Sequence, residues 1–121
     1  MIGIDLLEVE RLERALERRP ALAERLFHPG ELAHAARRPR PAMHLAARFA
    51  AKEAALKALT ARGVPLRDVE VEGGGNEAPR LRLHGAAAEL AERRGIVLDV
   101  SLTHTRAHAA AVVQARPSRP A

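Results

Sequence analysis

At 121 residues and without cysteine, the chain is long enough for one domain, lacks disulfides and thiolate metal sites, and fits a reducing compartment such as the cytoplasm. Hydrophobic residues make up 47% of it, but no run approaches the roughly 18 apolar positions of a membrane span, and we expect no signal peptide. A formal net charge of +5 predicts an acidic partner, which charge alone leaves open among nucleic acid, anionic lipid, a phosphorylated small molecule and an acidic protein.

The first part of the chain predicts a short strand followed by a helix. Isoleucines alternate with Gly3 and Asp5 over residues 2–7, so Asp5 faces away from the isoleucines. Over residues 8–19 the pattern becomes helical and two stripes separate. The apolar stripe consists of Val9, Leu12 and Leu16. The basic stripe consists of Arg11, Arg14 and Arg18. This basic stripe is either a docking surface or a solvated face paired with acidic neighbours.

Prolines divide the next stretch into short pieces. Pro20 ends the first helix, and brief helical segments follow at residues 22–27 and 31–36. Prolines on both sides of Arg40 keep residues 37–41 out of a helix, which predicts a stiff basic connector.

An alanine-rich segment over residues 45–62 predicts the central helix. At about 100° per residue, its leucines and Phe49 share one stripe, while alanine covers most of the remaining surface. A helix that is apolar nearly all round is normally buried. Glu53 and Lys57 lie four residues apart at the border of the stripe, where a charge is costly without a partner. They form either an ordinary ion pair or part of a ligand site, and the alanine-rich surroundings favour the ligand site. Gly63 is the predicted C-cap.

Beyond residue 65 the periodicity changes to two, and glycines mark the turns. This half predicts a hairpin, a helix ended by Gly95, and two further strands. In order, these segments cover residues 66–71, 81–83, 86–94, 97–102 and 107–114. The glycines at 73–75 lack the lysine and the helix that follow a phosphate-binding loop, so we interpret them as the hairpin turn.

Together the segments predict an α+β fold, with a small antiparallel sheet packed around the long buried helix. One domain spans residues 1–114, and residues 115–121 form a disordered tail. Because alanine buries little area, we expect another subunit to cover part of the apolar surface, especially residues 107–113.

Two acidic side chains are candidates for a metal site. Asp5 on the first strand and Glu53 on the buried helix supply oxygen ligands without completing a cage, which suits Mg²⁺ bound together with substrate phosphates. Their contact is inferred, and Asp5 is alternatively the N-cap of the next helix. The nearby cations and short polar donors are Arg48, Lys52, Lys57, Thr103, His104 and Thr105. These residue types are typical of phosphoryl transfer or diphosphate binding.

The spacing of one histidine pair resembles a zinc site, but its predicted secondary structure argues against one. His104 and His108 have a spacing found in helical zinc sites, but they fall on a predicted turn and strand. The remaining histidines are expected at the surface: His28, His34, His44 and His84.

Three segments in register resemble one known family. They are Gly-Ile-Asp-Leu at residues 3–6 with Glu8 and Arg11, Arg-Phe-Ala-Ala-Lys-Glu-Ala at residues 48–54 with Lys57, and Val-Ser-Leu-Thr-His-Thr at residues 100–105 followed by Ala-Ala-Ala-Val at residues 109–112. Their order and separations resemble those of the holo-acyl-carrier-protein synthases, a small trimeric group of 4'-phosphopantetheinyl transferases. The likeness covers residues 1–114.

The resemblance implies an enzyme that transfers the phosphopantetheine arm of coenzyme A to a serine of apo acyl carrier protein, with Mg²⁺, releasing adenosine 3',5'-bisphosphate. It implies that Asp5 and Glu53 bind Mg²⁺ with the diphosphate, and that Lys57 stabilises charge there or assists the leaving group. Residues implied to hold the nucleotide and its phosphates, partly across a subunit boundary, are Arg48, Lys52, Lys57, His104 and Thr105. The base for the serine proton is left open between Glu53 and metal-bound water.

An acidic carrier protein would also account for the net charge. The surface implied to receive it consists of Arg11, Arg14, Arg18, Leu12, Leu16 and Phe27. Two other functions stay open. A nucleic-acid-binding module is disfavoured by the lack of stacking aromatics, and a catalytically silent structural subunit is disfavoured by the presence of Asp5, Glu53 and Lys57 together. We therefore expect a cytoplasmic homotrimeric enzyme with no nucleic-acid or membrane partner.

Overall fold

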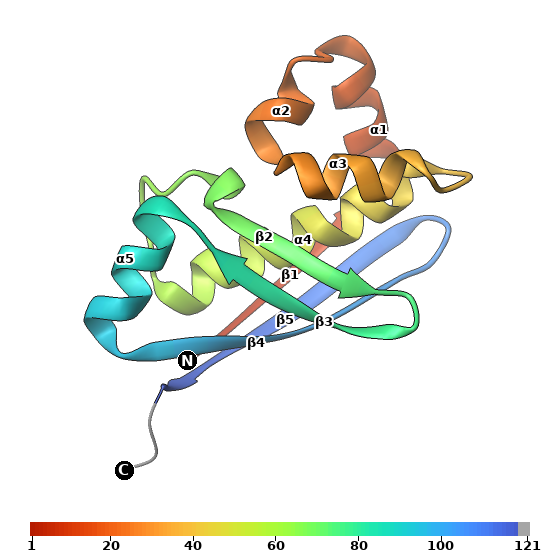
Figure 1. Cartoon of the computed structure of the whole chain (residues 1–121). Helices are drawn as coiled ribbons and strands as arrows, with labels where there is room; N and C mark the ends of the chain where they lie inside the picture. Colours follow the sequence, from red (N-terminus) through yellow and green to blue (C-terminus); the bar gives the residue numbers. More distant parts are fainter. Residues whose placement is uncertain (119–121) are drawn as a thin grey trace.

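The structure, a computed structural model, describes residues 1–118 and has the predicted α+β fold (Figure 1). One antiparallel sheet has three strands in the order β1-β5-β4, and a second sheet is the hairpin β2-β3. The strands are β1 (Ile2–Glu8), β2 (Val69–Gly74), β3 (Glu77–Leu83), β4 (Ile96–His104) and β5 (His108–Pro117). The helices are α1 (Val9–Arg18), α2 (Leu22–Leu26), α3 (Pro29–Ala36), α4 (Pro41–Leu59), α5 (Gly85–Arg94) and a 3-10 turn, Leu66–Asp68.

Helix α4 is the centre of the domain. It packs against all three strands of the larger sheet and against β2 of the hairpin, while α1 and α3 cover its N-terminal half (Figure 1). Its alanines form the core with small apolar residues of the strands, and Ala50, Ala54 and Ala58 are completely buried. The predicted buried alanine helix is thereby confirmed.

Strand β1 lies unusually close to α4 because residue 3 is glycine. A Cβ atom at Gly3 would overlap the carbonyl oxygen of Ala54 and would lie 2.8 Å from the amide nitrogen of Ala58. The missing side chain lets the strand backbone rest directly on the helix. Since residues of a strand alternate between faces, Asp5 then faces the helix as Gly3 does, and this placement prepares the site.

The other face of β1 carries large apolar side chains to the surface. Ile2, Ile4 and Leu6 are 68%, 67% and 69% exposed, and Val112 of β5 is 40% exposed. The predicted opposition of Asp5 and the isoleucines is confirmed, and it places the isoleucines outside. A contiguous exposed apolar face of this kind marks an interaction surface.

Several predicted boundaries are wrong. Helix α4 ends at Leu59 with Thr60 in the left-handed conformation (φ 50°), so Thr60, and not Gly63, follows the helix as its cap. Residues 66–68 form a 3-10 turn before β2 begins. The tail starts later than predicted, because residues 115–117 pair with β4 as part of β5, and residues 119–121 lie outside the described part of the chain. Within residues 1–118, no helix has the length and apolarity needed to cross a membrane.

Candidate active site

A cleft of about 500 Å³ opens between β1, α1 and α4. Three charged side chains line it: Asp5 of β1, Arg11 of α1 and Glu53 of α4. The rest of the lining is apolar, from residues such as Leu12 and Phe49. Asp5 and Glu53 therefore share one cavity, as the sequence interpretation requires. They come from segments almost fifty positions apart, and the close approach at Gly3 brings those segments together.

Glu53 is the less compensated of the two carboxylates. Burial raises the pKa of Glu53 above its ordinary value, the negative charge of Asp5 raises it further, and Lys57 only partly opposes these effects. The negative charge of Asp5 disfavours ionisation of Glu53 in this half-buried cleft, and a cation bound by both carboxylates would relieve the repulsion.

Lys57 reaches the cleft from the turn of α4 after Glu53. Its ammonium nitrogen donates to the carbonyl oxygen of Ile4 at 2.9 Å and lies 3.2 Å from Oδ1 of Asp5. The Lys57 side chain is 54% exposed, and an ammonium group has three donors. The predicted alternative, an ordinary ion pair of Lys57 with Glu53, is not what forms, because Lys57 turns to β1 instead.

Lys52 does not line this cleft, which corrects its predicted role in nucleotide binding. Its side chain is fully buried, and its ammonium nitrogen lies 2.5 Å from Oε1 of Glu31 on α3. It also donates to the carbonyl oxygens of Leu66 and Val69. All three of its donors are thus used inside the protein. Burial lowers the pKa of Lys52, and Glu31 is the main group that opposes this shift.

Arg48 lies one turn earlier on α4 and is 4% exposed. It donates to the carbonyl oxygen of Gly73 in the hairpin at 3.1 Å, while its Nε is buried without a partner among the described residues. Burial lowers the pKa of Arg48, and the nearby Glu31 opposes the shift. A buried guanidinium donor without a partner in the described part of the protein is suited to an anionic ligand.

Histidines form a row beside Arg48. The ring of His44 makes edge contacts with His34 and His104, with centroids 6.2 and 5.5 Å apart. Burial lowers the pKa of His34 and His44, and Arg48 lowers both further. The positive charge of Arg48 thus disfavours protonation of His34 and His44, and a bound anion would oppose this effect.

Thr105 follows His104 and closes the β4–β5 turn. Its hydroxyl accepts from the backbone N–H of His108 at 3.1 Å, and its own N–H donates to the carbonyl of His108 at 2.7 Å. The side chain of Thr105 thus has a structural task in this turn.

Of the residues predicted to hold the nucleotide, one chain brings Lys57 to the cleft but not Arg48, His104 and Thr105. Asp5 lies on the edge strand β1, whereas His104 lies on β4, the opposite edge of the three-stranded sheet. Neighbouring strands are about 4.8 Å apart, so the two edges are separated by about 10 Å. The structure therefore has two half-sites: the cleft with Asp5 and Glu53, and the basic row with Arg48 and His104.

The comparisons with known proteins agree with this geometry. The family model of the 4'-phosphopantetheinyl transferase superfamily matches residues 1–113. The chain belongs to this superfamily. A holo-[acyl-carrier-protein] synthase of Streptomyces coelicolor is 50% identical over 116 residues, which cover 93% of each chain. The corresponding protein of Syntrophus aciditrophicus is 45% identical over 116 residues, covering 92% of this chain and 91% of that one.

Solved structures extend the likeness to three dimensions. The crystal structure of Helicobacter pylori holo-[acyl-carrier-protein] synthase in complex with coenzyme A has a TM-score of 0.81 and 29% sequence identity, covering 96% of this chain and 100% of that one. The resemblance drawn from the three segments is thereby confirmed, and the protein is an enzyme of the holo-[acyl-carrier-protein] synthase type.

The basic stripe of this phosphopantetheinyl transferase lies at the mouth of the cleft. Arg11, Arg14 and Arg18 are all exposed, and Arg11 itself lines the cavity. Arg14 pairs with Glu10 at 2.5 Å, so part of the stripe is also the solvated face that the sequence left open.

Two residues predicted for the docking surface belong to the interior. Phe27 is completely buried, with the ammonium of Lys52 5.5 Å from its ring centroid. Leu12 is 5% exposed and packs in the same core cluster. Both anchor α1 and the α2–α3 link, because apolar side chains on the inner side of the stripe are needed to fix the helices.

Sequence reasoning missed two buried polar groups. The sequence pattern places Glu31 only near the start of a helix. In the structure it pairs with Lys52 and also accepts from the backbone N–H of His28, as in a capping box. His28 and His84 were expected at the surface, but both are half-buried against Glu70. The position of Glu31, three residues after His28, is the capping-box spacing and could have indicated its role at the start of α3. No nearby sequence pattern indicates that Glu70 contacts the two histidines.

Proposed function

We propose that the protein transfers the 4'-phosphopantetheine group of coenzyme A to a serine hydroxyl of apo acyl carrier protein and releases adenosine 3',5'-bisphosphate. The single observation that carries this proposal is the convergence of Asp5 and Glu53 in one cleft, with Lys57 on Asp5 and Arg11 at its mouth. The coenzyme A bound by the Helicobacter pylori relative supports the same donor for this chain.

The cleft fits Mg²⁺. Asp5 and Glu53 offer carboxylate oxygens only, and the raised pKa of Glu53 marks negative charge that lacks a full counter-charge. Magnesium prefers such oxygen ligands and is usually bound by one or two carboxylates together with phosphate oxygens and water. When bound, the ion would supply neutralisation of charge on the diphosphate.

The reaction breaks one bond and forms one at the same phosphorus atom. The serine oxygen attacks the phosphorus that carries the pantetheine arm, and the bond from that phosphorus to the oxygen bridging the two phosphates breaks. Lys57 has a donor left for the negative charge that develops on the leaving phosphate. The serine proton goes to a base in the cleft, where Glu53 is the group in place.

A homotrimer would join the two half-sites. The exposed apolar face of β1 and β5 favours association with further copies of the chain, and separation of the basic row from the cleft within one chain favours a site completed between subunits. In this arrangement Arg48 and His104 hold the nucleotide phosphates next to a neighbour's cleft. Sedimentation of the purified chain tests it, with the mass of three chains as the expected result.

The carrier protein would dock on the basic stripe. Arg11, Arg14 and Arg18 suit an acidic helix, and Arg11 leads directly to the cleft. A cytoplasmic location fits this partner and the absence of cysteine.

The decisive experiment is mass spectrometry of an apo carrier protein after incubation with the chain, coenzyme A and Mg²⁺. A mass gain of one phosphopantetheine group, lost with EDTA and restored by Mg²⁺, is the expected result. No gain with any divalent ion would leave a silent structural subunit or a binding module as the function.

A further inference from the structure

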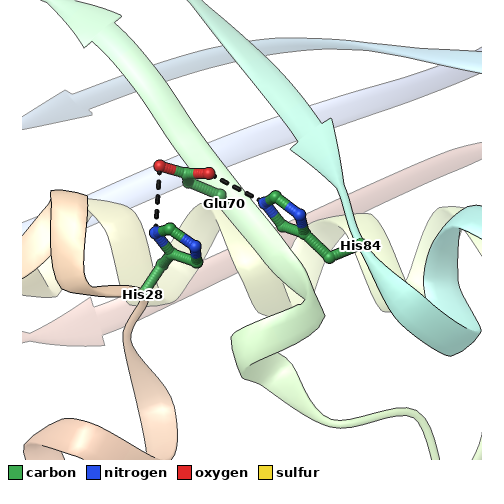
Figure 2. Close-up of side chains that lie close together, drawn as sticks. All are labelled: His28, Glu70 and His84. Atoms are coloured by element: carbon green, nitrogen blue, oxygen red, sulfur yellow. Dashed lines mark hydrogen bonds and ion pairs between the residues drawn. The ribbon is translucent and has the colours of Figure 1, made fainter.

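A second cluster of ligating side chains lies outside the cleft. His28 precedes α3, Glu70 lies on β2, and His84 follows β3, so three separate segments meet (Figure 2). None of the three lines the cleft of Asp5 and Glu53. The carboxylate of Glu70 is the centre of the cluster and its side chain is 11% exposed, whereas each imidazole side chain is 33% exposed.

The two imidazoles converge on one carboxylate. Nδ1 of His28 lies 3.2 Å from Oε2 of Glu70, and Nε2 of His84 lies 2.8 Å from Oε1 (Figure 2). The rings are nearly parallel, with 6° between their planes and 4.9 Å between their centroids. One ligand atom from each residue can be chosen so that all three lie within 4.8 Å of one another.

Lys52 lies near Glu70 but forms its ion pair with another residue. Although Lys52 is close enough for Glu70 to affect its pKa, its ammonium pairs with Glu31 and with backbone carbonyls. Glu70 is thus a nearly buried carboxylate. Within residues 1–118, its side-chain oxygens contact two imidazole nitrogens, those of His28 and His84. A buried carboxylate is stabilised by positive charge, which neutral imidazoles do not provide.

Nδ1 of His28 makes two contacts that conflict with each other in the absence of a cation. Its Nδ1 accepts a long hydrogen bond of 3.3 Å from the N–H of Gly30, which requires a lone pair on that nitrogen. The same nitrogen faces a carboxylate oxygen of Glu70, and two lone pairs repel each other unless a proton or a metal ion lies between them. A metal ion would satisfy the lone pairs of His28 and His84 together.

We infer that His28, Glu70 and His84 bind a divalent ion of the Zn²⁺ type, through Nδ1, a carboxylate oxygen and Nε2. Two imidazole nitrogens and one carboxylate oxygen form a typical three-residue zinc ligand set, with a fourth position for water. Ligand atoms of a tetrahedral zinc site are about 3.3 Å apart, because the bonds are roughly 2.0–2.1 Å long. The separations of 3.2 and 2.8 Å are to different oxygens of Glu70. With a single carboxylate oxygen as ligand, the three ligand atoms lie within 4.8 Å of one another, and rotations of the side chains would bring them to the zinc distance.

The donor set separates this site from the magnesium site. Nitrogen ligands select Zn²⁺ and similar transition metals, whereas Mg²⁺ prefers oxygen only. The bound ion would tie the start of α3 to both strands of the hairpin, including the segment that contacts Arg48. Its expected effect is on the stability of this region, because ligands from three segments are fixed at one point.

Isothermal titration of the chelator-treated chain with ZnCl₂ tests the inference. We expect one Zn²⁺ per chain, and a rise in Tm on the order of 5–10 °C when Zn²⁺ is about a hundredfold above its Kd. H84Q and E70Q should each weaken binding by more than the roughly 10–100-fold found for loss of an outer-shell partner. H108Q is the matched control, because this exposed histidine is outside the cluster, and it should bind as the wild type does.

Three results would overturn the inference. They are an absence of stoichiometric binding by the wild type, full binding by H84Q, and loss of the site in D5N, which would place the ion in the Asp5–Glu53 cleft. Long-range ¹H–¹⁵N NMR gives an independent reading: with Zn²⁺ bound, neither Nδ1 of His28 nor Nε2 of His84 should carry a proton. A proton on both nitrogens in the presence of Zn²⁺ would mean that the histidines only donate hydrogen bonds to Glu70.

Discussion

Lys52 and Glu53 are neighbours in sequence, yet they lie in opposite kinds of environment. Lys52 is fully buried, and every donor of its ammonium group has a partner inside the protein. Glu53 is half-buried in an open cleft, where Asp5 adds to its negative charge instead of balancing it. Helix α4 therefore carries Lys52, whose charge is fully paired, next to Glu53, whose charge Lys57 offsets only in part.

The comparison shows how to separate structural from functional charges in this protein. A buried charge that is fully partnered holds elements together, here α3, α4 and the start of β2. A charge left short of partners in a cavity marks a place for a ligand. Proximity in sequence to Glu53 made Lys52 look like a phosphate ligand, and burial decides otherwise.

The largest expected effect is on the structural side of this comparison. K52M should destabilise the protein by about 3–5 kcal/mol, because it leaves the buried carboxylate of Glu31 without its cation. Urea unfolding followed by circular dichroism measures the effect. R93M, which removes an exposed cation from α5, should change stability by less than about 0.5 kcal/mol. Equal effects of the two substitutions would mean that the buried pair is not a structural anchor.

Substitutions of the two cleft carboxylates should act mainly on activity. D5N and E53Q should each lower the rate of phosphopantetheine transfer by about 10²–10³-fold, since each removes a charge that binds the metal and the diphosphate. Carrier-protein mass spectrometry over time measures the rate. D99N and E89Q neutralise exposed carboxylates elsewhere and serve as controls. Wild-type rates in D5N and E53Q would remove the metal assignment.

Charge reversal on the basic stripe should have a smaller and more selective effect. R14E should raise KM for the carrier protein by roughly 10-fold and leave KM for coenzyme A unchanged, because Arg14 is exposed beside the cleft without lining it. Loss of its exposed pair with Glu10 should cost little stability. Steady-state kinetics with each substrate varied in turn separates the two constants. R93E is the matched reversal on α5, and a joint change of both constants in R14E would argue against docking there.

The smallest expected effect is on the free energy of unfolding, which the charge of Glu53 in the cleft lowers. Since the pKa of Glu53 is raised, the folded chain holds a proton on this group more strongly than the unfolded chain does. This contribution to stability is therefore lost as the pH rises from the ordinary value of 4.5 through the raised one. Without Mg²⁺, E53Q should be more stable than the wild type at neutral pH, by less than about 1 kcal/mol because solvent in the open cleft screens the charge of Glu53, with no difference well below pH 4.5.

Thermal unfolding over a pH series measures this difference. Added Mg²⁺ should narrow it by stabilising only the wild type. A wild type that is more stable than E53Q at neutral pH without metal would contradict the raised pKa.

Periodicity predicted the elements that pack locally and the helix that everything else covers. The alanine stripe identified α4, and the alternation around Asp5 placed its carboxylate on the inner face of β1. The ends of helices and strands were harder to predict from the sequence. Thr60 takes the left-handed conformation that glycine usually takes, because packing of α4 decides where the turn must occur.

Partners distant in sequence were the main omission. Glu31 reaches Lys52 from another helix, and Glu70 meets His28 and His84 across three segments, so no spacing in the chain announces either contact. Residue type made Asp5 and Glu53 candidates for one metal site, and the family resemblance supported the inferred contact between them. The structure then added its physical cause, which is the close approach of β1 at Gly3.

A shift of β1 by one residue in either direction would disrupt both of its faces. Its odd-numbered positions face the helix with the acid of the cleft, and its even-numbered positions present the isoleucines to the outside. Inserting a single residue before Asp5 would exchange the two sets, turning the acid outward and driving branched side chains against the Ala54 backbone. Seven residues of extended chain thus carry two surfaces that can change only together.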